Sequence, residues 1–432
     1  MKLSSICILI LVVAVGEVNY PDSVDAREPD RPLVNRKASE EALRIEKAAV
    51  QNLGGSVHAY HPDGRVKELY ASDESISDEK LRFLKELPRV EDLFLYESPI
   101  SDVGLVHVGS LKELRELTLT RTKIQGPGLV HLVGLSKLKH LDLEMTDVGD
   151  ASIVHVGKIK SLRHLDMDST DVTDDGLRHL AGLANLEELS LQYTDVTGKG
   201  IKELHALATL RHVKMDGEDI GEADFAYFSR LQRLQILSID RARLGRTGLQ
   251  HLSQVRSLTE LYLFKANFKE GELRHLPALS NLRLLSLRDT PVSNDGLKHI
   301  RQLTQLESLD LYDTKVTDDG VTQLAGLHRL REFSLSRKQI TDAGLDCLTG
   351  MPQLEELSLF DTNVTDVGIK KIGPLKNLRY LDLADTKITD AGLRRLHSLE
   401  KLEWLHVNGC PVTEEGLRQL KKALPKCQVE HD

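Results

Sequence analysis

The most regular feature of the chain is a pattern of leucines and polar residues that recurs every 24 residues. In the copy formed by residues 306–329, LESLDLYDTKVTDDGVTQLAGLHR, apolar residues first alternate with polar or aromatic ones. This alternation predicts a short strand with one buried and one open face. Val321, Leu324 and Leu327 then follow at helical spacing, so each copy predicts a strand, a turn and a helix.

Fifteen copies of this unit follow one another without an insertion. Their first apolar residues are Val66, Val90, Leu114, Leu138, Leu162, Leu186, Leu210, Leu234, Leu258, Leu282, Leu306, Leu330, Leu354, Leu378 and Leu402. Self-similarity at this period predicts a solenoid, in which each unit packs against its neighbours and one apolar core runs along the chain.

The start of each predicted helix has a signal of its own. Thr317 suits an N-cap because its hydroxyl can accept a hydrogen bond from an unpaired amide, and Asp318 and Asp319 suit the positive end of the helix dipole. Ten of the fifteen copies have Ser or Thr at this cap position. The other five have Gln125, Gly149, Gly221, Gly245 and Lys269.

Residues 66–432, with their strand leucines and TDxGL-like helix starts, resemble the leucine-rich repeat family. The similarity is to its longer, helix-bearing repeats of the ribonuclease-inhibitor-like and F-box-associated types, and the subtype looks closest to exported bacterial proteins with TDxGL repeats. It implies an α/β solenoid, an arc with parallel strands on the concave face and helices on the convex face. The chain departs from the family where many repeats have Asn after the strand, because eight copies have Thr: Thr122, Thr146, Thr170, Thr194, Thr290, Thr314, Thr362 and Thr386.

The N-terminal residues predict export. Residues 1–16 combine an early lysine with an apolar run from Ile6 to Val15 and small residues before a possible cleavage site, as in a secretory signal peptide. The run is shorter than the about 20 residues that span a bilayer. Residues 17–36 contain three prolines and mixed charges, which is typical of a linker.

A cap is predicted at each end of the repeats, since the open end of a solenoid core needs a cover. Residues 37–65 predict a helix, ended by two glycines, and a hairpin, and Ala42, Ile45, Ala49 and Leu53 form the apolar stripe of that helix. The fifteen repeats occupy residues 66–425, and residues 426–432 form a short C-terminal cap. Three copies in residues 210–281 match the helix-start pattern poorly, through either drift or a local change that serves a partner.

Composition narrows the classes of partner and chemistry. The net charge of -9 and the pI near 6.0 argue against nucleic acid, which calls for a basic surface. Cys347, Cys410 and Cys427 show no CxxC spacing and predict small core residues rather than a disulfide framework. No sequence feature calls for a cofactor or supplies a nucleophile, a phosphate-binding loop or an HExxH motif, so we expect no enzyme.

Histidines and carboxylates meet on two neighbouring predicted strands. His140 and Asp142 in one copy correspond to His164 and Asp166 in the next, and strands about 4.8 Å apart would place them side by side. Such a set could bind a divalent cation. An acidic, solvated patch that suits a basic partner is the simpler interpretation.

Aromatic residues are only 4% of the chain, yet ten of them fall on or beside the predicted concave face. Aromatic side chains on an open face favour binding, because each can bury a large area at little entropic cost. Strand positions also favour Tyr and Phe for structural reasons alone. The candidate partner-binding residues are Tyr262, Phe264, Asp310, Tyr312, Phe360, Tyr380, Asp382 and Trp404.

Together these features favour an exported, non-catalytic protein that binds a protein or peptide, possibly a basic one, through its concave face. An intracellular F-box-like substrate receptor of a ubiquitin ligase is an alternative, which the apolar N-terminus and the lack of F-box helices before the repeats weaken. A metal-dependent site at the His140–Asp166 patch is a further alternative.

Overall fold

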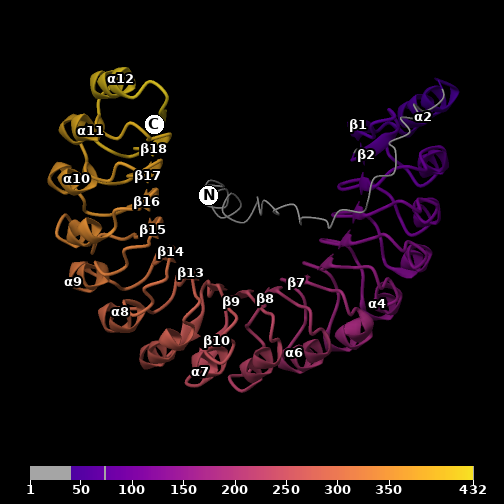
Figure 1. Cartoon of the computed structure of the whole chain (residues 1–432), viewed down its shortest axis with the longest axis horizontal. Helices are drawn as coiled ribbons and strands as arrows, with labels where there is room; N and C mark the ends of the chain where they lie inside the picture. The colour runs from indigo at the N-terminus through magenta and orange to yellow at the C-terminus, as the bar shows by residue number, and fades with distance from the viewer. Residues whose placement is uncertain (1–39, 73, 432) are drawn as a thin grey trace, which may run out of the picture.

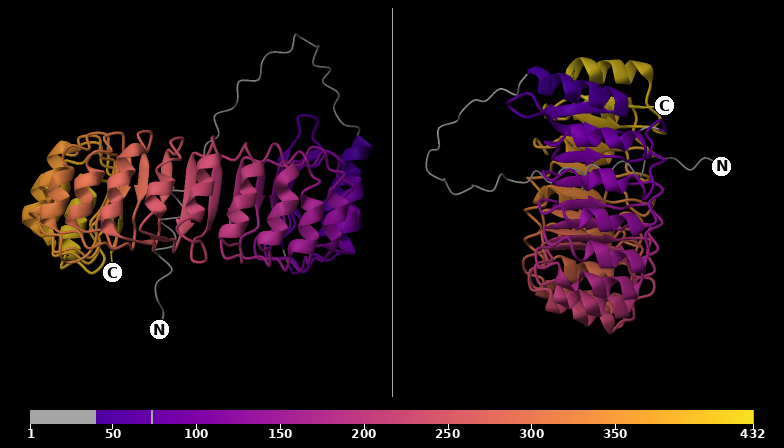
Figure 2. Two further views of the ribbon diagram at one scale, coloured as in Figure 1. Left: turned by 90° about the horizontal axis from the view of Figure 1, so that it is seen from below. Right: turned by 90° about the vertical axis from the view of Figure 1, so that its right-hand side faces the viewer.

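The computed structural model describes residues 40–72 and 74–431. Strands line the inside of an arc and helices cover its outside, from the N-terminal helix α2 at one end to α12 at the other (Figure 1). Figure 2 shows that the helices form a single layer along the outer surface. The predicted signal peptide at residues 1–16 and linker at residues 17–36 lie outside the described residues.

A single sheet of 17 strands forms the inner layer within the described residues. Neighbouring strands from β2 onward pair in parallel with a register of 24 residues, as in Leu309 opposite Phe333, whereas β1 pairs antiparallel with β2. The strands of this sheet are β1 Ser56–Tyr60, β2 Val66–Tyr70, β3 Asp92–Phe94, β4 Glu116–Thr118, β5 His140–Asp142, β6 His164–Asp166, β7 Glu188–Leu191, β8 His212–Asp216, β9 Ile236–Asp240, β11 Glu260–Tyr262, β13 Leu284–Ser286, β14 Ser308–Asp310, β15 Glu332–Ser334, β16 Glu356–Ser358, β17 Tyr380–Asp382, β18 Trp404–His406 and β19 Gln428–Glu430.

Short helices form the outer layer. The α-helices are α2 Glu40–Leu53, α3 Leu105–Val108, α4 Asp150–Val156, α5 Asp174–Leu177, α6 Gly198–Glu203, α7 Gly248–Leu252, α8 Asn294–Ile300, α9 Asp318–Val321, α10 Asp366–Ile372, α11 Asp390–Leu396 and α12 Glu414–Ala423. The 3-10 helices are η1 Lys80–Glu86, η2 Pro127–Leu132, η3 Arg178–Gly182, η4 Leu204–Ala206, η5 Asp224–Arg230, η6 Glu270–Ala278, η7 Thr322–Leu324 and η8 Gly344–Gly350. Several copies thus replace the predicted α-helix with the tighter 3-10 form.

One continuous core lies between the two layers, as the leucine pattern predicts. Leu309 and Leu311 are at most 1% exposed. Asp310, which lies between them, and Tyr312, which follows Leu311, are half-buried on the concave side. Removing each such leucine from water contributes about 2 kcal/mol. Cys347 and Cys427 lie in this core, in agreement with the sequence prediction.

Every regular copy turns out of its strand through one residue in the left-handed backbone region. Twelve residues other than glycine occupy it, with φ between 54° and 79°, and they recur at the 24-residue period: Glu97, Arg121, Met145, Ser169, Tyr193, Arg241, Lys265, Asp289, Asp313, Arg337, Asp361 and Asp385. Only glycine adopts this conformation readily, so the other residue types stay there because the surrounding repeats hold them.

The threonine that replaces the family asparagine follows this turn directly. In each of the eight copies the threonine hydroxyl donates to the carbonyl three residues back, for example from Thr146 Oγ1 to Leu143 O at 2.6 Å. The other seven bonds are equivalent. The threonine hydroxyl, whose hydrogen bond is satisfied, therefore closes the turn in place of the amide side chain of asparagine.

An aspartate clasp joins each regular copy to the next. Asp342 accepts from Thr365 N at 2.8 Å, from Thr365 Oγ1 at 2.7 Å and from Gly368 N at 2.9 Å. Asp174 makes the same three contacts to the following copy. The first Asp of the TDxGL pattern thus bonds across copies, rather than serving only the dipole of its own helix.

The predicted threonine caps form in part. Thr173, Thr197, Thr365, Thr389 and Thr413 each accept a hydrogen bond from an amide of the first helical turn. Thr317 makes no such cap bond, so the prediction for this residue is wrong. Asn294 stands at the clasp position before it, and its Nδ2 donates to Thr317 Oγ1 at 2.8 Å.

The N-terminal end begins with α2, which packs against η1, and the hairpin β1–β2. Ile45, predicted on the inner stripe of α2, is 41% exposed, so that prediction is wrong. Glu46 is buried in its place, because its carboxylate pairs with Arg65 and accepts from Val66 N at 2.8 Å.

Candidate functional site

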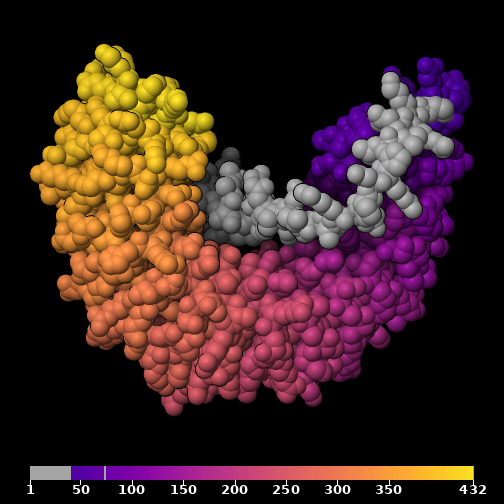
Figure 3. All heavy atoms as spheres, in the orientation of Figure 1, coloured from indigo at the N-terminus to yellow at the C-terminus, as the bar shows by residue number. Residues whose placement is uncertain are grey.

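The concave face is a continuous open surface along the inside of the arc. It is formed by the strand residues that alternate with the core leucines and by the turn residues that follow them. Figure 3 shows the hollow between the two arms of the arc. Parallel pairing at a 24-residue register stacks equivalent residues in columns across this face, so each column brings together side chains that are far apart in the sequence.

The N-terminal half of this face holds a histidine–carboxylate ladder on β5 to β8. The rings of His140 and His164 stack with centroids 4.0 Å apart and planes 7° apart. Glu188 lies between two histidines, with one oxygen 2.8 Å from His164 Nδ1 and the other 2.7 Å from His212 Nδ1.

Two members of the ladder, Glu188 and His140, have shifted pKa values. Burial alone would raise the pKa of Glu188, but hydrogen bonds from His164 and His212 outweigh it and lower that pKa below its usual range. Burial, with the neighbouring His164, lowers the pKa of His140 to about 4. His140 is therefore neutral at physiological pH.

The candidate metal residues do not converge on a common point. His140 and His164 face each other as stacked rings, and Asp142 accepts from Thr120 Oγ1 at 2.7 Å and from Glu144 N at 2.8 Å. Within residues 40–72 and 74–431, no group of three or more His, Cys, Asp or Glu is arranged to hold a metal ion. The strands do bring Asp142 and Asp166 together as register partners, as predicted.

Carboxylates crowd the strand ends of the same half. Burial and the neighbouring Asp168 raise the pKa of Asp166 to about 7, and burial and Asp216 raise that of Asp240 to about 6. Burial also raises the pKa of Asp168 and of Glu144. Such crowding favours an approaching cation, which would relieve the repulsion between the carboxylates.

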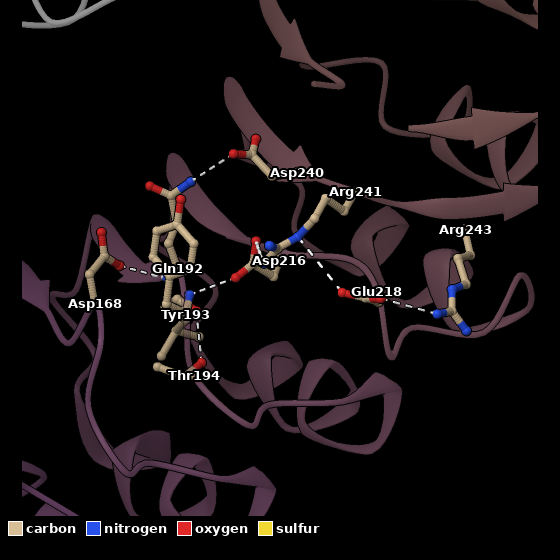
Figure 4. Close-up of polar contacts among 10 residues, drawn as sticks. Asp168, Gln192, Tyr193, Thr194, Asp216, Glu218, Asp240, Arg241 and Arg243 are labelled. Carbon is tan, nitrogen blue, oxygen red and sulfur yellow. Dashed lines mark hydrogen bonds and ion pairs between the residues drawn. The ribbon is translucent and has the colours of Figure 1, made fainter. Parts of the chain in front are cut away.

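A polar network extends from this acidic half to the turns on its edge (Figure 4). Tyr193 is 63% exposed, its amide donates to Asp216 at 2.6 Å, and Arg241 lies over its ring at 5.5 Å. Arg241 pairs with Asp216 at 2.9 Å, and Glu218 joins Arg241 to Arg243. Tyr193 is more exposed than any of the aromatic residues that the sequence analysis names as partner-binding candidates, and it is not among them.

The C-terminal half holds the predicted aromatic residues. Tyr312 and Phe360 stack with centroids 6.0 Å apart, although one copy separates them in the sequence, and Arg288 lies 4.0 Å over the Tyr312 ring. Tyr380 and Trp404 are register partners on β17 and β18, and Trp404 is 45% exposed.

The four aromatics therefore form two pairs rather than one cluster. Tyr380 and Trp404 begin their strands, whereas Tyr312 and Phe360 follow the ends of theirs, an offset of about 13 Å along the strand direction. Tyr262 donates to Glu260 at 2.8 Å, and Lys265 lies 4.8 Å over the ring of Phe264. A ligand that contacts all of them would have to cross the width of the sheet.

Asp310 and Asp382, predicted as open acidic residues, are held in the sheet. Asp382 is 7% exposed and accepts from Ala384 N at 3.0 Å and Ser358 Oγ at 3.1 Å. Asp310 accepts from Tyr312 N at 2.9 Å and Ser286 Oγ at 3.2 Å. Burial raises the pKa of both carboxyls. Asp310 and Asp382 therefore add little open negative charge to the concave face.

The copies in residues 210–281, which match the helix-start pattern poorly, also differ from the other copies in structure, at positions outside the concave face. Gly198 and Arg246 occupy clasp positions and supply no carboxylate there. A small extra sheet forms instead from β10 Arg243–Gly245 and β12 Asn267–Phe268, beside an open pocket of about 580 Å³.

Two family models match the chain. The first, described as a leucine-rich repeat region, matches residues 86–270, and the second, described as a leucine rich repeat, matches residues 352–412. A solved leucine-rich-repeat protein of Leptospira interrogans is 21% identical with a TM-score of 0.56, over 81% of this chain and 91% of that one. The chain is a leucine-rich repeat protein. These matches agree with the fold that the 24-residue period predicts.

Two further solved structures are similar to this leucine-rich repeat protein at lower scores. An internalin of Listeria monocytogenes is 19% identical with a TM-score of 0.41, over 85% of this chain and 94% of that one. A plant peptide hormone receptor in complex with RGF2 is 14% identical with a TM-score of 0.39, over 85% of this chain and 68% of that one. A search of curated proteins gives no match. Among the described residues, no helix combines the length and apolar character that crossing a bilayer requires.

Proposed function

We propose that this leucine-rich repeat protein is an exported, non-catalytic binding protein whose concave face holds a protein or peptide ligand. The observation behind the proposal is the placement of aromatic side chains on the open side of a long sheet whose core leucines are fully buried. Trp404 and Tyr193 are exposed, and Tyr312 and Phe360 form a stacked pair between them. Aromatics held in this way bury large areas on binding and lose little entropy.

The two halves of the face suit different parts of such a ligand. Tyr312, Phe360, Tyr380 and Trp404 offer apolar anchors, whereas Glu144, Asp166 and Asp168 offer half-buried carboxylates. A polypeptide with basic residues toward the β5–β9 half and apolar residues toward the β14–β18 half would match both. The clasps and the continuous core give the surface the rigidity that lowers the entropic cost of binding.

Export rests on the sequence of residues 1–16. The helix-bearing repeats resemble those of exported proteins and of F-box receptors alike, so the N-terminus separates the two proposals. Determining the N-terminal residue of the protein purified from its source tests export. A chain that begins near Glu17 supports it, and a chain that retains residues 1–16 inside the cell supports the F-box-like alternative.

Affinity capture from the source organism tests the binding proposal. Residues 17–432 serve as bait beside a variant with Tyr312, Phe360, Tyr380 and Trp404 changed to Ala. The captured protein is then purified and titrated against both baits by calorimetry. We expect the variant to lose at least about 100-fold in affinity, since each buried aromatic anchor contributes about 1 to 2 kcal/mol.

The control bait changes Val103, Val130 and Val367 to Ala. These are exposed apolar residues of the helices and turns away from the concave face. Equal capture by wild type and this control, with loss by the aromatic variant, supports the concave face. Equal affinity for all three baits contradicts it.

A further inference from the structure

The outer surface carries an apolar patch on three consecutive copies, whose helices α3, η2 and α4 lie side by side (Figure 2). Each of these copies presents two apolar residues, three positions apart, at the start of its helix. Val103, Val106 and Val130 are 71%, 47% and 46% exposed. Two more of these residues are exposed and the last is half-buried. Together they form the valine patch: Val103, Val106, Pro127, Val130, Ala151 and Val154.

The copies on either side of the valine patch have opposite charges at the same two positions. Glu79 pairs with Arg82 at 2.5 Å before the patch, and Asp175 pairs with Arg178 at 2.7 Å after it. All four side chains are more than half exposed. No other two consecutive copies are apolar at both positions. An exposed apolar surface with charged residues at its border is typical of an interaction site.

The valine patch and its charged borders form two rows that run along the arc, one helical turn or about 5 Å apart. The first row consists of Glu79, Val103, Pro127, Ala151 and Asp175, and the second of Arg82, Val106, Val130, Val154 and Arg178. Both ends of the first row are therefore acidic, and both ends of the second row are basic.

These two rows are complementary to each other under a twofold rotation. An axis that lies in the interface and runs along the arc, between the rows, places the first row of one molecule opposite the second row of another. Glu79 then faces Arg82 of the other molecule, and Asp175 faces Arg178. An axis across the arc would place Glu79 opposite Asp175, and like charges disfavour that arrangement. The charges thus select the axis along the arc.

The same charges argue against other occupants of the patch. Each border carries one acid and one base, so its net charge is zero. An anionic membrane surface, or a partner with charge of a single sign, would gain attraction from one row and repulsion from the other. A second molecule of this chain presents both signs in the matching order.

We propose that the valine patch is the interface of a twofold dimer of this chain. Pro127 of one molecule packs against Val130 of the other at the centre, and the remaining apolar pairs follow on both sides. Removing these side chains from water drives the association. The charged borders fix the direction of the axis, and the helices of the two molecules run antiparallel.

The curvature of the arc limits the size of this contact. The outer surface is convex (Figure 1), so two molecules touch over a few copies and separate beyond them. The long side chains of the borders face each other where the gap begins to widen. Because the apolar contact spans only three helices of each molecule, we expect a reversible dimer with a dissociation constant of about 10 to 100 µM.

The dimer leaves both concave faces open, because it joins the two arcs through their outer surfaces. The inference therefore stands apart from the proposed ligand and does not depend on it.

Sedimentation equilibrium of the purified protein, from about 1 to about 500 µM, measures this association. We expect the mass to rise with concentration from that of one chain toward that of two. Val130→Asp should weaken the dimer at least about tenfold, because it places a carboxylate at the centre of the apolar contact. Val367→Asp is the matched control, since Val367 has the same helix position in a copy away from the patch and is 58% exposed. It should leave the dimer unchanged.

Charge reversal tests the direction of the axis. Asp175→Arg places an arginine opposite Arg178 of the other molecule and should weaken the dimer about three- to tenfold. Adding Arg178→Asp restores opposite charges in the same arrangement, so the double variant should associate as tightly as wild type. Asp295→Arg breaks the equivalent exposed ion pair of α8, with Lys298, and should change nothing.

A monomer at every concentration overturns the proposal and leaves the patch to the chain's own N-terminal residues or to a different partner. A dimer that Val130→Asp does not weaken also overturns it, because the molecules then associate through another surface. Circular dichroism shows whether each variant is folded. A dimer that Asp175→Arg strengthens, or that the double variant fails to restore, contradicts the axis along the arc.

Discussion

At the scale of single residues, the turn position with a left-handed backbone is the feature that is hardest to predict from the sequence. Four of its twelve occupants are Asp, which enters the left-handed region more readily than most residues, but Glu97, Met145 and Tyr193 give no such signal. Glycine, the usual signal, is nearly absent from the column. Glu97, Arg241, Lys265 and Arg337 adopt the conformation without a threonine after them, so the repeat as a whole imposes it rather than one neighbouring residue type.

Replacing a residue at this position by glycine should stabilise the repeat. We expect Ser169→Gly, at φ 55°, to raise the free energy of unfolding by about 0.5 to 1 kcal/mol, because glycine adopts the left-handed region without steric cost. Ser169→Val should lower it by about 1 to 2 kcal/mol. Urea denaturation of both variants measures these changes. A neutral Val variant would contradict the assigned strain.

The crowded carboxylates predict a pH-dependent stability. The pKa of Asp166 is raised from 3.8 to about 7, so its ionised form destabilises the fold above pH 7, and this cost disappears as the pH falls toward 4. Asp166→Asn keeps the oxygen that accepts from Asp168 N. The variant should be more stable than wild type by about 2 kcal/mol at pH 8 and equal to it at pH 4. Urea denaturation at both values tests this, and a pH-independent difference would contradict it.

At the scale of elements, the sequence predicted a strand and a helix in each copy, but not the 3-10 form of several helices, the extra sheet of β10 and β12 or the contacts that join the copies. The local rules for helix starts identified Thr365 and Thr389 as caps correctly. The same rules assigned Asp318 and Asp319 to the helix dipole, whereas Asp318 clasps Thr341 of the next copy. The partner of Asp318 lies 23 positions further along the chain. A local sequence pattern cannot identify it unless the stacking of the copies is already known.

Removing a clasp should cost far more than removing an exposed aspartate. Asp342→Ala leaves Thr365 N, Thr365 Oγ1 and Gly368 N without their acceptor, and we expect a loss of about 2 to 4 kcal/mol. Asp195→Ala is the matched control, because Asp195 is exposed and should change stability by less than about 0.5 kcal/mol. Thermal and urea unfolding measure both. Equal effects would show that the clasp contributes nothing.

At the scale of the whole molecule, the period of the leucines predicted the fold because the same positions are buried in every copy. The binding face was less predictable, since its side chains differ from copy to copy and their burial depends on neighbours. Asp382 looked open on its strand but is held by Ser358 of the previous copy. The four aromatics lie in one run of copies in the sequence but divide between the two ends of the strands.

The missing clasps predict uneven flexibility along the arc. Gly198 supplies no carboxylate to the next copy, so the amides of residues 221–224 have no clasp between copies. Gly221 N donates instead to Asp224 Oδ2 of its own copy at 3.3 Å, a longer contact than the 2.8 Å from Thr365 N to Asp342. We expect these amides to exchange with deuterium at least about tenfold faster than those of residues 365–368. Peptide-resolved hydrogen exchange measures the difference. Uniform protection would mean that the clasps do not limit local opening.

Site-specific photocrosslinking tests the central claim, that the concave face holds a polypeptide ligand, most directly. A benzophenone amino acid placed at Phe360, on the concave face, and separately at Val367, on α10, reports contact with a partner in the source organism's extract. We predict a specific crosslinked protein from position 360, lost when Tyr312 and Trp404 are changed to Ala, and none from position 367. The same crosslink from both positions, or one from position 367 alone, would contradict the account.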